Sequence, residues 1–207
     1  MSTRAVFTLA LLLALPTLAA SHQLDEYLQA VRLDITRDRI VVNIALTPGV
    51  NVATRVITLI DMNADGELSS SERDTYARGL LTDLVLEIDG QRQALALSNC
   101  HFPSRSEMTT GLGTIHVAAA ADLTPVSLGH HQLLLRNDHQ AEIGVYLVNA
   151  LTPDTEEIEI TGQQRDPLQH ELHVEYTVTS RTLLRLSLCG FALSLTVLAG
   201  YRSRSQS

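Results

Sequence analysis

The stretch VRLDITRDRIVVNIAL, residues 31–46, decides the fold class. Apolar residues alternate with polar ones on both sides of the turn at Arg37-Asp38. Alternation with a period of two puts every second side chain on the same face of a strand. Two such runs joined by a short turn predict an antiparallel hairpin with one buried face.

The same alternation continues along the chain. Residues 84–88 lead into Asp89-Gly90, a strong two-residue hairpin signal, and Leu95 and Leu97 follow. Further short runs lie at residues 115–117, 133–135, 143–147, 158–160 and 172–178. Eight or nine strands joined by turns predict a mainly β protein, an antiparallel β-sandwich.

The pattern changes between the second and third predicted strands, where residues 61–72 are DMNADGELSSSE. Oxygen-bearing side chains occupy positions 1, 3 and 5 of this stretch, and Gly66 stands at position 6, where the chain must turn sharply. Ca²⁺ takes six to eight oxygen ligands, and a twelve-residue loop supplies them at fixed positions. Leu68 is expected to pack inward. The candidate ligands are the side chains of Asp61, Asn63 and Asp65, the backbone carbonyl of Glu67, Ser69 through water, and the bidentate carboxylate of Glu72.

Both flanks of this loop carry a helical pattern. Asn51 can cap the first helix. Apolar residues recur at helical spacing before the loop, at Val52, Val56, Leu59 and Ile60, and after it, at Tyr76, Ala77, Leu80, Leu81 and Leu84. Residues 51–84 therefore resemble a single EF-hand inserted into the β domain, and the resemblance implies one bound Ca²⁺. The alternative is an acidic surface turn that binds nothing.

The loop is expected to bind its ion with modest affinity. EF-hands of the calmodulin type occur in pairs, and neither residues 89–90 nor residues 137–139 provide a second loop. The loop itself carries three carboxylates. These features predict a Kd of roughly 10⁻⁵ to 10⁻³ M and a structural rather than a signalling ion.

Composition and motifs narrow the class of function. The formal net charge is −8, and all 15 basic residues are Arg. A field of this sign repels phosphate backbones and attracts cations, so nucleic-acid binding is disfavoured. No nucleophile with an identifiable base stands out, and the sequence predicts a non-catalytic protein.

The two ends of the chain carry targeting signals. Residues 1–20 have the composition of a secretory signal peptide, with cleavage after Ala20, or alternatively after Ala19 or Ser21. From Leu183 to Tyr201 the chain is apolar apart from Arg185, and residues 181–201 are long enough to span a membrane. The arginines in residues 202–207 place this tail in the cytoplasm. The alternatives are a helix buried in the soluble domain, or a sorting tail that is later removed.

The segment HQLDEYLQA, residues 22–30, resembles the start of the exported domains that precede hydrogenase/urease-accessory-type (HupE/UreJ-like) bacterial membrane proteins. Those families are associated with transport of nickel or related metals. The resemblance implies a bacterial envelope protein. It also raises an alternative function, an accessory domain that handles Ni²⁺ or Cu²⁺. Its ligands would be an N-terminal His22, if cleavage follows Ser21, and histidines across strands such as His116, His130 or His139.

Together these features predict a calcium-binding envelope protein anchored by a single membrane span. The exported domain, residues 21–180, would lie on the periplasmic or extracellular side. It would act by contact with a partner protein of the envelope rather than by catalysis.

Overall fold

The computed structural model describes residues 25–153 and 155–180. The predicted signal peptide (1–20), membrane segment (181–201) and cytoplasmic tail (202–207) lie outside the described residues, as does His22. Within the described ranges, no helix is both long enough and apolar enough to cross a membrane.

In the described part of the chain, ten strands form two five-stranded sheets. Sheet A has the order β5-β6-β2-β1-β8, with bounds Ala96–His101, Ile115–Asp122, Arg39–Pro48, Tyr27–Ile35 and Gly144–Ala150. Sheet B has the order β4-β3-β7-β10-β9, with bounds Gln91–Arg92, Leu84–Ile88, Gly129–Asn137, Glu171–Val178 and Ile158–Arg165.

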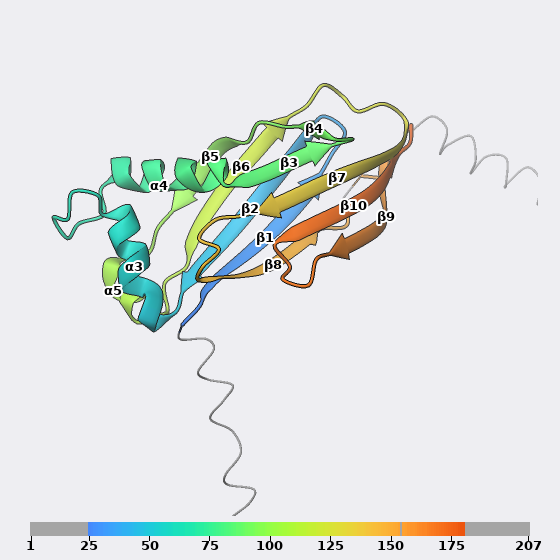
Figure 1. The fold of residues 1–207 in the computed structure, drawn as a ribbon. Helices are drawn as coiled ribbons and strands as arrows, with labels where there is room; N and C mark the ends of the chain where they lie inside the picture. Colours follow the sequence, from blue (N-terminus) through green and yellow to red (C-terminus); the bar gives the residue numbers. More distant parts are fainter. Residues whose placement is uncertain (1–24, 154, 181–207) are drawn as a thin grey trace, which may run out of the picture.

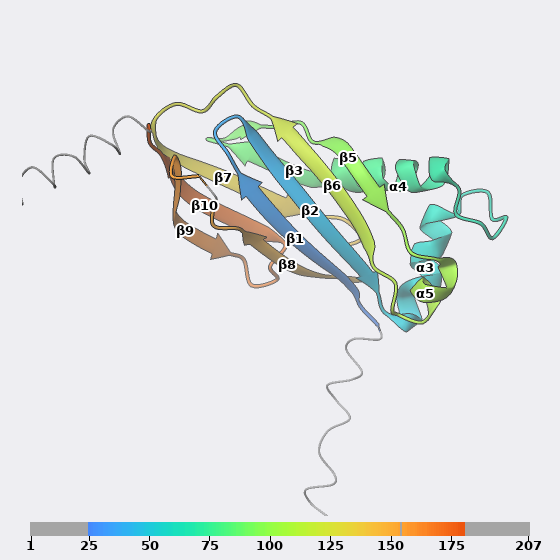
Figure 2. The ribbon, with the colours of Figure 1, turned by 180° about the vertical axis from the view of Figure 1, so that it is seen from behind.

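The two sheets lie face to face, and Figures 1 and 2 show each of them in front of the other. Alternate residues of each strand enter one shared core, such as Leu33 and Ile44 from sheet A and Leu135 and Val174 from sheet B. The predicted mainly β, two-sheet fold is therefore confirmed. The hairpin of residues 31–46 is also confirmed, since Ile35 pairs with Ile40.

The prediction of a wholly antiparallel sandwich was wrong at one pair, because β1 and β8 run parallel. The chain leaves β7 of sheet B, crosses to the edge of sheet A, and enters β8 beside the start of β1, where Tyr27 pairs with Gly144. Two strands that start at the same end must run in the same direction.

The hairpin at Asp89-Gly90 is present but short. Both residues have positive φ, 51° and 76°, as a tight two-residue turn requires. The returning strand β4 is only Gln91–Arg92, and the chain then crosses to sheet A, where β5 pairs with β6. Leu95 and Leu97 therefore pack against the core without extending that hairpin.

Helices lie between β2 and β3, as the sequence predicted, at one end of the sandwich (Figure 1). They are α3 (Val50–Ile60) and α4 (Ser70–Thr82); a short third helix, α5 (Arg105–Thr109), lies beside them. The predicted apolar faces are largely buried, but Leu59 is 40% exposed and Leu84 begins β3. Asn51 caps nothing: Gly49 is the N-cap, and Asn51 bonds to Asp25.

A buried chain of hydrogen bonds ties α4 to the sheets. The Tyr27 hydroxyl lies 2.7 Å from that of Tyr76, and the Tyr76 hydroxyl lies 3.0 Å from His139 Nε2. On the other side of the imidazole, Nδ1 lies 2.7 Å from the Asp83 carboxylate. Because Asp83 can only accept, Nδ1 carries the proton, Nε2 accepts from Tyr76, and Tyr76 accepts from Tyr27.

The backbone around His139 is held by the same cluster. Gln29 and Tyr146 both donate to the His139 carbonyl, at 2.7 Å and 2.9 Å, and Asn137 accepts from the His139 amide. Burial lowers the pKa of the His139 imidazole, although Asp83 opposes the shift, and it raises the pKa of Tyr27 and Tyr76. The chain from Tyr27 to His139 is therefore uncharged at neutral pH.

Replacing Tyr76 with Phe removes both the acceptor for Tyr27 and the donor for His139, and leaves two buried polar groups unpaired. We expect the free energy of unfolding to fall by about 1–3 kcal/mol, measured by urea denaturation. Tyr176→Phe is the matched control: this ring is also buried, but its hydroxyl makes no hydrogen bond to the described residues. Equal losses in both variants would contradict the role given to the chain of hydrogen bonds.

Candidate metal centre

The loop between α3 and α4 is shaped by its own side chains. Asn63 Oδ1 accepts from the Asp65 amide at 3.0 Å, and Asp65 Oδ1 accepts from the Glu67 amide at 2.8 Å. Such bonds let short polar side chains fold the backbone into successive turns. Ala64 and Gly66 take left-handed conformations, with φ of 57° and 90°. The sharp turn predicted at Gly66 is therefore present.

Asp61, the first predicted ligand, is only 7% exposed. Its Oδ2 accepts from the Gly66 amide at 3.1 Å and from the Arg105 guanidinium at 2.8 Å. Its Oδ1 is buried and has no hydrogen-bond partner. A buried carboxylate oxygen without a donor is costly, so this atom requires an explanation.

Glu72, the last predicted ligand, closes the loop from the other side. Its Oε2 accepts from the amide and hydroxyl of Ser69, at 2.9 Å and 2.6 Å, which forms a capping box at the start of α4. Its Oε1 accepts from the Met62 amide at 3.0 Å. Hydrogen bonds from Ser69, and more weakly from Asn63 and Met62, lower the pKa of this carboxyl. The two ends of the loop are thus joined through an ionised group.

The six predicted ligands do not all converge in this arrangement. Asp61 and Glu72 lie buried at the closed end, whereas Asn63 and Asp65 lie at the exposed tip, where the Asn63 amide donates to Asp65 Oδ2 at 2.8 Å. Glu67 and Ser69 are also exposed. In residues 25–153 and 155–180, no three or more His, Cys, Asp or Glu side chains are grouped so as to hold a metal ion. Leu68 packs inward as predicted, 7% exposed.

Sequence reasoning missed Arg105. This residue begins α5, and the segment around it lines a cavity of about 580 Å³ together with Gly66, Leu68 and Arg73. The sequence does carry a signal for the start of α5. Ser104 and Glu107 have the spacing of a capping box, and the structure forms it. That signal predicts the helix, but not that its first side chain reaches a loop 44 residues away.

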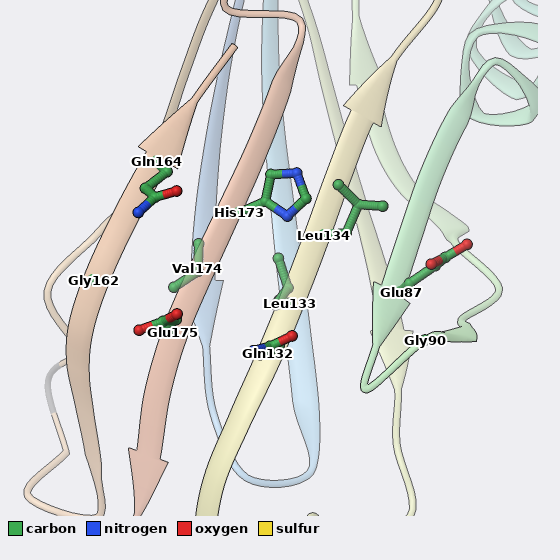
Figure 3. A pocket seen from close by; sticks show the side chains of 10 residues that line it. All are labelled: Glu87, Gly90, Gln132, Leu133, Leu134, Gly162, Gln164, His173, Val174 and Glu175. Carbon is green, nitrogen blue, oxygen red and sulfur yellow. The ribbon is translucent and has the colours of Figure 1, made fainter.

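A shallow groove also lies on the outer face of sheet B. Figure 3 shows His173 of β10 near its centre, with Glu175 on the same strand and Glu87 on β3. The groove is about 380 Å³, and the absence of a side chain at Gly162 opens it on one side. His173 is paired with Glu171 at 2.7 Å, and the lining includes no hydrogen-bonded nucleophile and base.

The adjacent histidines His130 and His131 of β7 point to opposite faces of sheet B. His131 faces the core and bonds to Asp89, whereas His130 faces outward and bonds to Thr177. Cys100 is a partly buried free thiol 3.6 Å from an Asp74 oxygen.

Searches against protein-family models, curated proteins and solved structures found no match to this chain. A function for the loop therefore depends on the chemistry of its own residues and their contacts.

The left-handed turn can be tested without any ion, in the presence of a chelator. A Cβ at Gly66 would meet nothing within 4 Å, so Gly66→Ala should cost only the backbone conformation, about 1–2 kcal/mol of unfolding free energy. Ala64→Gly is the control. It relieves the same kind of strain but adds chain entropy to the unfolded state, so a change below about 1 kcal/mol is expected. An unchanged free energy of unfolding in Gly66→Ala would show that the loop does not need this turn.

Proposed function

We propose that this chain is a calcium-binding, membrane-anchored envelope protein in which loop 61–72 holds one structural Ca²⁺. The observation that carries the proposal is the buried Oδ1 of Asp61, which has no donor. The Gly66 amide and Arg105 both contact the other oxygen, Oδ2, so Oδ1 is left for a cation. A bound cation would satisfy this oxygen.

The donor set suits a hard cation, since every candidate ligand is an oxygen. Asp61, Asn63, Asp65 and Glu72 would hold the ion through their side chains, Glu67 through its carbonyl, and Ser69 through water. Asn63, Asp65 and Glu72 would have to exchange hydrogen bonds within the loop for contacts with the ion. That exchange agrees with the modest affinity expected for an unpaired loop.

The proposed role of the ion is to fix α3 and α4 relative to each other. The loop is the direct connection between the two helices, and α4 is joined to the sheets through Tyr76. A ligand that binds only the folded form stabilises it by about 2.7 kcal/mol at 100 times its Kd. Loss of the ion would therefore loosen the helical end first.

The position of the last described strand determines how an anchored domain would be oriented. The described part ends just after Val178, which pairs with Gly129 and Ile158. This end of the sandwich lies opposite the helices (Figure 1). A membrane span at residues 181–201 would thus leave the helical end pointing away from the bilayer. We propose that this end contacts a partner protein of the envelope and that the domain is not an enzyme.

The ion can be tested by calorimetric titration of the purified full-length chain with Ca²⁺. Asp61→Asn and Glu72→Gln should each weaken binding by about tenfold or more, because each removes a charged ligand. Glutamine at position 72 can keep the bonds from Ser69 but loses the acceptor for the Met62 amide, so circular dichroism is needed to check that this variant folds. Glu67→Gln is the matched control, because only its backbone is a ligand, and its affinity should stay within about threefold. Equal affinity in all variants would refute the loop as the site.

Arg105 provides a second test of the same proposal. Its positive charge lies against Asp61 and would repel a bound cation, so Arg105→Gln should tighten Ca²⁺ binding. We expect a gain of roughly 0.5–1 kcal/mol at low salt, since the arginine is partly exposed and the effect is screened. The gain should vanish at high salt. Weaker binding would instead mean that Arg105 orients Asp61 as a ligand.

A further inference from the structure

The described histidines fall into two groups. Five of the seven have a ring nitrogen within hydrogen-bond distance of a protein group: His130, His131, His139, His170 and His173. The other two, His101 and His116, show no such contact with the described residues, and both are exposed. Their ring nitrogens are therefore open to a ligand from solvent.

These two histidines are direct neighbours across strands. His101 ends β5 and His116 lies near the start of β6, and the antiparallel register places them opposite each other. Residues directly opposite in such a pair share a face, with Cβ atoms about 4.5–5.5 Å apart. Two imidazoles at this separation can reach one ion from the same side.

The register of β5 puts both side chains outward. A bulge between Leu97 and Asn99 shifts the pairing by one residue. Beyond it, Cys100 packs against the core opposite Val117, so its neighbour His101 faces solvent. Without that bulge, His101 would face inward and Cys100 outward.

The surroundings leave room for a hydrated ion. The two histidines line a shallow cavity of about 330 Å³ together with Ala45, Asn99 and Arg32, whose positive charge opposes cation binding. The Glu107 carboxyl lies close enough to His101 to interact with it. Hydrogen bonds from Ser104 chiefly lower the pKa of this carboxyl, and the His101 imidazole adds to the shift. A negative charge therefore stands near the pair.

We propose that His101 and His116 form a binding site for a borderline transition-metal cation, Ni²⁺ or Zn²⁺, on the outer face of sheet A. Both rings would bind through nitrogen, and water would complete the coordination. Imidazole suits such metals, whereas the oxygen donors of loop 61–72 suit Ca²⁺, so the two sites differ in chemistry. With only two protein ligands, the site suits an exchangeable ion better than a permanent one.

The test is calorimetric titration of the full-length chain with Ni²⁺ and with Zn²⁺, in excess Ca²⁺ to saturate loop 61–72. His101→Gln and His116→Gln should each weaken binding by about tenfold or more, because one of two protein ligands is lost. His173→Gln is the matched control, an exposed strand histidine on the other sheet, and should bind as the wild type does. Binding should also weaken in acid, because protonated imidazole is no ligand.

Two results would overturn the proposal. The first is transition-metal binding that survives both substitutions but is lost in His22→Gln, which would place the site at the start of the exported domain. The second is no heat of binding from either metal at millimolar concentration. Neither result would refute the calcium proposal, which is tested by titration with Ca²⁺ alone.

Discussion

The hydrogen-bond chain from Tyr27 through Tyr76 and His139 to Asp83 is the constraint on which the helical end depends. It joins β1 of one sheet, α4, and the turn after β7 of the other sheet. Each member is either buried and uncharged or, like Asp83, partly open to water. A neutral imidazole with one donor and one acceptor is the only form that satisfies both neighbours.

This constraint explains how the helix-loop-helix is held in a fixed position against the two sheets. Helices α3 and α4 contact the rest of the molecule through buried apolar residues such as Val56 and Leu80. Apolar contacts set how much area is buried but not the orientation. The directional bonds of Tyr76 fix α4 in one position, and loop 61–72 then fixes α3 against α4. Arg105 of α5 adds a further contact, to Asp61 at the start of this loop.

Local features were predictable from the sequence, and long-range ones were not. The hairpin of residues 31–46, the turn at Asp89-Gly90 and loop 61–72 all depend on residues within about a dozen positions of each other. The parallel pairing of β1 with β8, and the crossing of β5 to sheet A, depend on which edge a returning chain reaches. Residue alternation is the same for either edge, so the pattern carries no information about it.

The same distinction holds for the candidate sites. The candidate ligands in loop 61–72 could be proposed from spacing alone, because one loop supplies all of them, but spacing did not predict that Asn63 and Asp65 lie at an exposed tip. The contact between Arg105 and Asp61 could not be predicted in this way. The pattern of the loop and the pattern of α5 each contain no information about the other. The pairing of His101 with His116 depends on a bulge at residues 97–99, which shifts every later residue of β5 to the opposite face. A single-residue register change therefore decides whether those two imidazoles meet.

The two proposed cation sites are linked by a short piece of chain. His101 ends β5, and Arg105 begins α5 four residues later, with Glu107 behind it. Arg105 contacts Asp61, while the His101 imidazole helps to lower the pKa of Glu107. Cations bound at both sites would repel each other across this segment. Coupling between binding sites is reciprocal. Calcium at the loop and a transition metal at the histidine pair would therefore each weaken the other, by an amount that screening by salt reduces.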